Sequence, residues 1–208
     1  MTMTPEGQEE APQAAPEAVP PVQPAPVVAP RIAYLGYCGV IDSAGVTRIA
    51  QTLNAAVNAQ YTEVYLCFTS AGGYIGDGIY LYNHIKALPI PLTIHNTGTV
   101  ASIATTIFVG AQRRLCSPNG MFMMHPVTVG AKAQSLAIKP LVESLQAAIA
   151  DEARTESILR AHTSLPDAIL GQRRETDVYI AAQDALRYGL VHEVVEFALP
   201  PGNQVVQI

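Results

Sequence analysis

The chain has 208 residues, 49% of them hydrophobic and 14% charged, which is enough for one substantial core and too few for two full domains. Its net charge of −5 gives no electrostatic case for nucleic acid or an anionic membrane as a partner. The three cysteines are widely spaced and form no C-x-x-C motif. This favours reduced, buried thiols in a cytoplasmic protein over a disulfide framework or a metal site.

Residues 1–30 are dominated by Pro, Ala, Glu, Gln and Val and contain eight of the 16 prolines. Such a segment lacks many backbone donors and offers little to bury, so we expect a disordered tail. It has no basic region followed by an apolar one, and therefore does not resemble a secretory signal.

Between residues 31 and 125, apolar runs alternate with segments of helical periodicity. Strands are expected at 32–38, 63–68 and 91–96, followed by a β-rich stretch at 113–125 that a turn at 117–120 interrupts. Helices are expected after an Asp42-Ser43 N-cap, at 75–88 and from residue 103. This alternation with short connections predicts an α/β fold, with a parallel sheet flanked by helices.

Beyond residue 132 the pattern changes to one long amphipathic helix, extending to about residue 162. Pro140 is expected in its first turn or at a kink. Such a helix has too little core of its own and should pack against a partner subunit or project as an arm. A strand at 177–180, a helical turn ending at Gly189, a closing strand at 191–197 and a loose tail at 200–208 complete the chain.

Three small or polar segments each follow a predicted strand: Gly72-Gly73, Ser102 and His125. Ligand sites of parallel sheets lie beyond the carboxyl ends of the strands, so one site could use all three. Ser102 would sit at a helix N-terminus, where unpaired N–H groups favour negative charge. Taken singly, Ser102 would be an N-cap, His125 a core or turn histidine, and the glycines a turn.

Four motifs resemble the Clp protease proteolytic subunit family, in order and at similar spacing, from about residue 32 to 195. They are Thr69-Ser70-Ala71-Gly72-Gly73, Gly98-Thr99-Val100-Ala101-Ser102, Cys116-Ser117-Pro118-Asn119 leading to Met123-Met124-His125-Pro126, and Glu175-Thr176-Asp177 leading to Ala185-Leu186-Arg187-Tyr188-Gly189-Leu190-Val191. The resemblance implies a crotonase/ClpP-like spiral of β-α-β units over residues 31–199, with a protruding handle helix at about 132–163.

The resemblance also implies an activity and an assembly. It implies a serine endopeptidase that stacks as heptameric or double-heptameric rings around a chamber, with polypeptide as substrate. It implies no cofactor of its own, because a partner Clp-type ATPase uses the ATP and feeds in unfolded chains. In the family, a segment before the first strand contributes to ATPase docking. In this chain only the Pro/Ala-rich tail precedes the first strand, and it does not resemble that docking segment. The resemblance therefore supports an ATPase partner less than it supports the ring.

By the same resemblance, Ser102 is the nucleophile, His125 the general base and Asp177 the acid that orients the histidine. The oxyanion donors are the backbone N–H groups of Gly73 and Ile103. The family usually has Gln where Pro126 stands, and proline lacks an N–H in the strand that receives substrate.

Three alternatives keep the fold and change the chemistry. A catalytically silent ring subunit would have the same residues without an activated serine. A crotonase-type acyl-CoA enzyme would use the same paired amides, but Asp77 is the only carboxylate close to the Gly72-Gly73 loop. A Ser–Lys dyad would need a suitably placed lysine, and no lysine of the chain, Lys86, Lys132 or Lys139, matches such a position.

Overall fold

The computed structural model describes residue 2 and residues 30–128 and 138–208. The predicted tail, apart from residues 2 and 30, and the predicted start of the long helix at 132–137 lie outside the described residues. The elements are β1 (Ile32–Cys38), α1 (Ser43–Asn58), β2 (Glu63–Ser70), α2 (Ile75–Lys86), β3 (Leu92–Ala101), α3 (Ile103–Val109), β4 (Arg113–Cys116), β5 (Met121–Met124), α4 (Ile138–His162), α5 (Asp167–Gln172), β6 (Val178–Ala181), α6 (Ala182–Arg187), β7 (Glu193–Val194) and β8 (Val206–Gln207).

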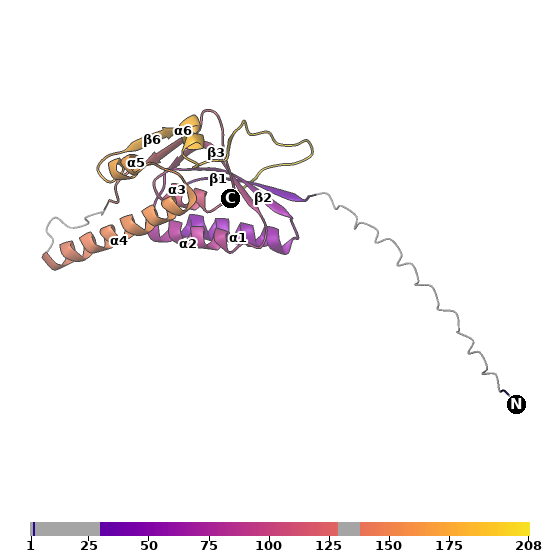
Figure 1. The fold of residues 1–208 in the computed structure, drawn as a ribbon, viewed down its shortest axis with the longest axis horizontal. Coiled ribbons are helices and arrows are strands. Elements are labelled where there is room, and N and C mark those ends of the chain that lie inside the picture. Colours follow the sequence, from indigo (N-terminus) through magenta and orange to yellow (C-terminus); the bar gives the residue numbers. More distant parts are fainter. Residues whose placement is uncertain (1, 3–29, 129–137) are drawn as a thin grey trace.

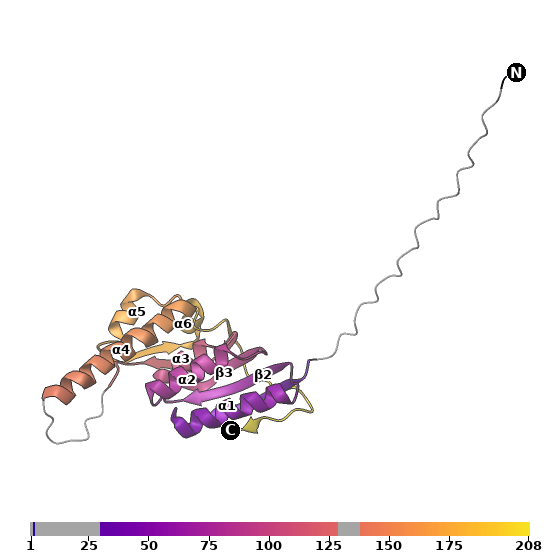
Figure 2. The ribbon, with the colours of Figure 1, turned by 90° about the horizontal axis from the view of Figure 1, so that it is seen from below.

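The predicted α/β architecture is confirmed. The main sheet has the strand order β6-β5-β3-β2-β1-β8, and β4 joins it through β3. Strands β1 to β5 pair in parallel, whereas β6 runs antiparallel to β5. Helices α1 and α2 lie side by side along one side of the sheet (Figure 1, Figure 2).

Contacts in α1 and β2 explain the sequence patterns that predicted these two elements. The Asp42 carboxylate accepts the N–H of Gly45 at 2.7 Å, so the predicted N-cap of α1 is confirmed, an interaction worth about 1 kcal/mol. Alternate residues of β2 are buried, namely Val64, Leu66 and Phe68. Each such side chain contributes about 1.5–3 kcal/mol when it is fully buried.

Strand β3 is longer than predicted. The sheet branches at its centre, because its two halves pair with different strands. Its first half, residues 93–96, pairs with β4, and residues 99–101 pair with β5. Asn96 stabilises the branch, because its Nδ2 donates to the Met121 carbonyl at 3.0 Å and its Oδ1 accepts the N–H of Gly98 at 3.0 Å. The branch places the end of β5, and hence His125, beside the end of β3, and hence Ser102.

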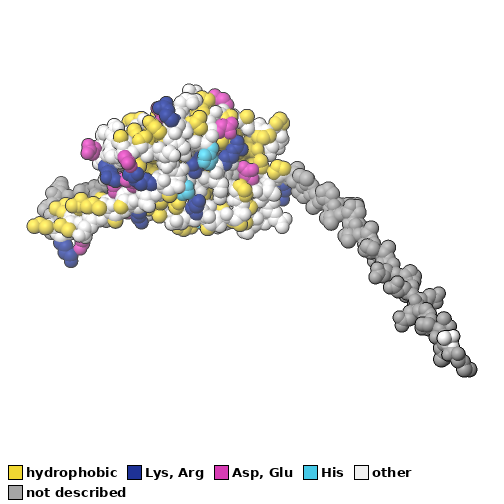
Figure 3. Space-filling model, viewed as in Figure 1, with side chains coloured by type: hydrophobic (Ala, Val, Ile, Leu, Met, Phe, Trp, Pro, Cys, Tyr) yellow, Lys and Arg dark blue, Asp and Glu magenta, His cyan; other side chains and the backbone are white. Residues whose placement is uncertain are grey.

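Helix α4 projects from the body of the molecule (Figure 1, Figure 2), with Pro140 in its first turn, as predicted. Its buried residues, Thr155, Glu156 and Leu159, all lie in its second half. The projecting half has hydrophobic side chains on its surface (Figure 3), and its exposed large apolar residues are Ile138, Leu141, Val142, Leu145 and Ile149. Among the described residues, no helix is long and apolar enough to cross a membrane.

The C-terminal segment differs from the loose tail that was expected. Residues 206–207 form β8, which pairs in parallel with β1, and the Ile208 N–H donates to the Gly36 carbonyl at 2.9 Å. At Gly36 the side chain of Gln207 fills the space where a Cβ would be, with its Nε2 atom 2.5 Å from that position. The predicted strand at 191–197 is reduced to the two residues of β7.

The cysteines are free, but only Cys116 is buried; Cys67 is half-buried and Cys38 exposed, so burial was correctly predicted for one of three. Burial raises the pKa of the Cys116 thiol to about 11. His95 is fully buried between the Tyr65 hydroxyl, 2.6 Å from its Nδ1, and the Ser117 hydroxyl, 3.1 Å from its Nε2. This packing indicates a structural role for His95.

Candidate active site

Ser102 occupies a strained turn between β3 and α3. Its φ and ψ are 56° and −132°, a conformation that costs a non-glycine residue about 1–3 kcal/mol. Its N–H donates to the Met123 carbonyl of β5 at 2.7 Å. Within the described part of the chain its hydroxyl makes no capping bond to α3, so the simple N-cap interpretation is not supported. Strained strand-to-helix turns of this kind hold nucleophilic serines away from the backbone.

The Gly72-Gly73 turn lies directly against Ser102. Gly72 has φ 97°, and a Cβ on it would be 2.6 Å from the Ser102 Cβ. A Cβ on Gly73, whose φ is 158°, would be 2.0 Å from the Ile41 carbonyl oxygen. A larger residue at Gly72 would therefore push the turn away from the serine, and one at Gly73 would collide with the backbone of Ile41.

Two backbone N–H groups beside Ser102 have no hydrogen-bond acceptor among the described residues. The residues next to Gly73 are bonded to Ile41, since Ile41 N–H donates to the Gly72 carbonyl and Tyr74 N–H to the Ile41 carbonyl. The Gly73 N–H itself has no acceptor in residues 30–128 and 138–208. Ile103 is the first residue of α3, so its N–H has no acceptor within the helix. These are the two donors expected from the sequence.

His125 and Asp177 lie next to the last pair of the β5–β6 ladder. The antiparallel register ends with Met124 paired with Val178. His125 directly follows Met124, and Asp177 directly precedes Val178. The ladder thus brings the ends of two segments together, although His125 and Asp177 are 52 positions apart in the sequence.

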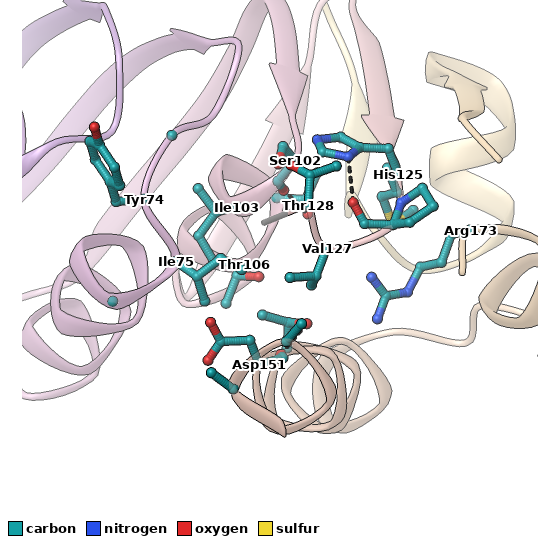
Figure 4. A pocket seen from close by; sticks show the side chains of 18 of the residues that line it. Tyr74, Ile75, Ser102, Ile103, Thr106, His125, Val127, Thr128, Asp151 and Arg173 are labelled. Carbon is teal, nitrogen blue, oxygen red and sulfur yellow. Dashed lines mark hydrogen bonds between the residues drawn. The ribbon is translucent and has the colours of Figure 1, made fainter. Parts of the chain in front are cut away.

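The three predicted catalytic residues do not form a closed hydrogen-bonded triad. His125 Nδ1 donates to the carbonyl of Pro126 at 2.7 Å (Figure 4). Asp177 is exposed. Across the described residues, no hydrogen bond joins Ser102 to His125 or His125 to Asp177.

A cavity of about 480 Å³ opens between Ser102 and helix α4. Ser102, Ile103 and His125 line one side, and Asp151 of α4 lies on the other (Figure 4). Arg173, which follows α5, also lines it. The sequence pattern did not indicate Asp151 or Arg173 as site residues, because α5 was not predicted and nothing in the local pattern indicates which side of α4 faces a serine.

Arg173 belongs to a group of charged residues behind the cavity. It is only 4% exposed, and its Nη2 lies 2.5 Å from Glu152 Oε1 and 3.8 Å from Glu156 Oε2. The short contact has the distance of an ion pair but not the angle of a hydrogen bond, and Arg173 Nε has no partner in the described ranges. Burial lowers the pKa of Arg173, and the two glutamates oppose that shift.

Glu156 holds the outer part of this group together. Its oxygens accept N–H groups of Arg160 at 2.9 Å and of Arg174 at 2.6 Å. Burial alone would raise the pKa of Glu156, but the bonds from Arg174 and Arg160 outweigh it and the pKa is lowered.

The fold and the site together define a class: mixed α/β proteins that present a serine on a strained strand-to-helix turn, beside free amides and a histidine. The family model for Clp protease matches residues 33–198. The chain therefore belongs to the Clp protease family, and the expected family membership is confirmed.

Two relatives from the family are about a quarter identical to this chain over the residues that they match. "ATP-dependent Clp protease proteolytic subunit 3" of Rhizobium etli is 26% identical over 159 residues, covering 76% of this chain and 80% of the relative. "ATP-dependent Clp protease proteolytic subunit 1" of Streptomyces avermitilis is 27% identical over 175 residues, covering 83% and 78%. The fold is similar to that of a ClpP1 mutant from Listeria monocytogenes, with a TM-score of 0.69, 20% identity, and coverage of 80% of this chain and 92% of the other.

Proposed function

We propose that this chain is a serine endopeptidase that hydrolyses peptide bonds with Ser102, His125 and Asp177. The observation that carries the proposal is the convergence of three separate segments: the strained Ser102 turn, the Gly72-Gly73 loop and the β5–β6 ladder. A conformation that costs free energy at Ser102 is maintained by the surrounding structure, as at functional sites generally.

The chemistry follows from the atoms at the site. The Ser102 hydroxyl attacks a peptide carbonyl while His125 takes its proton and later donates it to the leaving amine. The N–H groups of Gly73 and Ile103 bind the oxyanion that forms. Asp177, which directly precedes β6, is the acid of the triad and stabilises the imidazolium. The substrate chain would enter the cavity beside α4, where its side chain meets Thr106, Asp151 and Thr155.

We further propose that the protein works as a homo-oligomeric ring, heptameric or double-heptameric. The projecting half of α4 exposes a stripe of apolar side chains that a second copy would bury. Relatives are named as subunits of ATP-dependent proteases, so a Clp-type ATPase is the proposed partner for delivering polypeptide. The free thiols fit a cytoplasmic location.

Mass photometry tests the assembly. The wild type is expected to give one large species, and Leu145→Glu, which places a charge on the exposed stripe, should shift it towards smaller species. A matched change on the polar side of the same helix, Lys139→Glu, should leave the mass unchanged. Wild-type monomers at all concentrations would contradict the ring.

A fluorophosphonate probe tests the catalytic assignment. We expect labelling at Ser102, located by mass spectrometry, and none in Ser102→Ala. A second candidate is a catalytically silent ring subunit, which the open arrangement of His125 and Asp177 favours. Assembled rings that take no label and cleave no peptide, alone or in lysate, would establish that candidate instead.

A further inference from the structure

Glu152 of α4 connects two segments that lead to the proposed catalytic residues. Its Oε2 accepts the N–H of Val127 at 3.3 Å, two residues after His125. Its Oε1 lies 2.5 Å from Nη2 of Arg173, four residues before Asp177. The Glu152 side chain is 19% exposed and the Arg173 side chain 5%, so solvent screens this pair weakly.

The bond to Val127 acts on His125 through a single peptide unit. The Pro126 carbonyl and the Val127 N–H belong to the same planar unit and point in opposite directions. The carbonyl accepts the proton of His125 Nδ1 at 2.7 Å, while the N–H donates to Glu152. The ring of Pro126 restricts the φ angle of that residue, so few torsion angles set the orientation of the Pro126–Val127 peptide unit. The bond from Val127 N–H to Glu152 restrains the remaining ones.

A carbonyl oxygen can only accept, so this bond requires the proton of neutral His125 to be on Nδ1. The lone pair is then on Nε2, the nitrogen that a general base offers to a serine. The peptide unit that Glu152 restrains is therefore the group that selects the tautomer of His125 in this structure.

We propose that Glu152, fixed by Arg173, is a positioning residue that sets the tautomer and orientation of His125 through the Pro126–Val127 peptide. This inference rests on the proposed function of His125 as the base. In this structure the Pro126 carbonyl supplies the orienting bond that the resemblance assigned to Asp177, and the role left to Asp177 is to stabilise the imidazolium.

The surrounding charges make Glu152 the principal counter-ion of Arg173. Glu156 is the other nearby carboxylate, at 3.8 Å, and its oxygens already accept N–H groups of Arg160 and Arg174. Asp151 is paired with Arg154 at 2.6 Å. Arg173 is thus paired mainly with Oε1 of Glu152, and Oε2 is the oxygen that accepts the N–H of Val127.

Glu152→Gln is the decisive variant. A glutamine has one acceptor oxygen, which the charged Arg173 should take, and the amide NH₂ would then face the N–H of Val127. Glu156→Gln is the matched control, because it removes the same charge one turn further along α4 without contacting Val127. Should Glu152→Gln fail to fold, Glu152→Asp keeps the charge but shortens the reach towards Val127.

The tautomer of His125 is read from ¹⁵N–¹H correlations in protein with isotopically labelled histidine, with His125→Gln identifying the signal. The wild type and Glu156→Gln should show the Nδ1–H tautomer, and Glu152→Gln should lose it. Fluorophosphonate labelling of Ser102 should slow at least tenfold in Glu152→Gln and less than twofold in the control. For a peptide substrate, kcat should fall with little change in KM.

The outcomes separate this inference from the proposed function. An unchanged tautomer and labelling rate in folded Glu152→Gln would overturn the role of Glu152, as would faster labelling. A wild type that takes no label and cleaves no peptide, alone or in lysate, would refute the peptidase assignment. The tautomer comparison needs no activity and would still decide on Glu152.

Discussion

Two glycines of α2, Gly76 and Gly78, offer a sharp test of how the helices support the Ser102 turn. A Cβ at Gly78 would lie 2.2 Å from Cγ1 and 3.1 Å from Cδ1 of Ile103. A Cβ at Gly76 would have nothing within 4 Å. Ile103 is 3% exposed and supplies one of the two proposed oxyanion amides. Gly78→Ala should therefore disturb the site, and Gly76→Ala should not.

The expected magnitudes follow from these contacts. Replacing glycine by alanine in a helix favours folding by up to about 1 kcal/mol. Gly76→Ala should gain part of this, because its methyl group faces open space. Gly78→Ala gains the same propensity term, but overpacking against Ile103 costs about 1–3 kcal/mol. The free energies of unfolding of the two variants should thus differ by about 1–3 kcal/mol, or roughly 2–12 °C in Tm for a chain of this size.

Differential scanning fluorimetry gives the Tm, and the fluorophosphonate labelling rate reports on the site. Gly78→Ala should melt below Gly76→Ala and label Ser102 at least tenfold more slowly, because losing one oxyanion donor entirely costs about 10²–10³ in rate. Equal Tm values and equal labelling rates would refute the reasoning. They would mean that the Ile103 side chain can move aside without shifting its backbone.

Two further predictions concern buried polar side chains. Burial lowers the pKa of His95 in the folded protein below the ordinary value of about 6.5. Neutral His95 therefore contributes fully to the stability of the fold above pH 6.5. This contribution is lost as the pH falls from the ordinary pKa towards the lower pKa of the folded state. The fall in wild-type Tm between pH 7.5 and 5.5 should be smaller in His95→Gln, and an equal fall would contradict this assignment. Buried Arg114 donates to four backbone carbonyls, so in chemical denaturation Arg114→Met should lose at least about 3 kcal/mol. The control Arg113→Met loses one exposed ion pair, worth about 0–1 kcal/mol. A similar loss of stability in the two variants would contradict the prediction, because it would mean that the carbonyls bonded to Arg114 find other partners.

Local patterns were sufficient to predict many elements of this molecule. The apolar runs predicted the bounds of β1 and β2 to within two residues. Asp42 was correctly identified as the N-cap of α1. These features depend on neighbours within one or two turns of chain, so residue type and spacing determine them. The motifs around Gly73, Ser102 and His125 were likewise visible, because each directly follows a strand.

Contacts between distant residues determined the rest. The branch of β3 depends on Asn96 bonding Met121, and β8 joins the C-terminal residues to β1. His125 bonds to the Pro126 carbonyl, and Glu152 of α4 pairs with Arg173. Both contacts depend on how α4 packs against the rest of the molecule. The sequence by itself determined which chemical groups are available and which strands and helices present them. Only the tertiary structure decided which acceptor each group meets, because that depends on distances between segments that no local periodicity encodes.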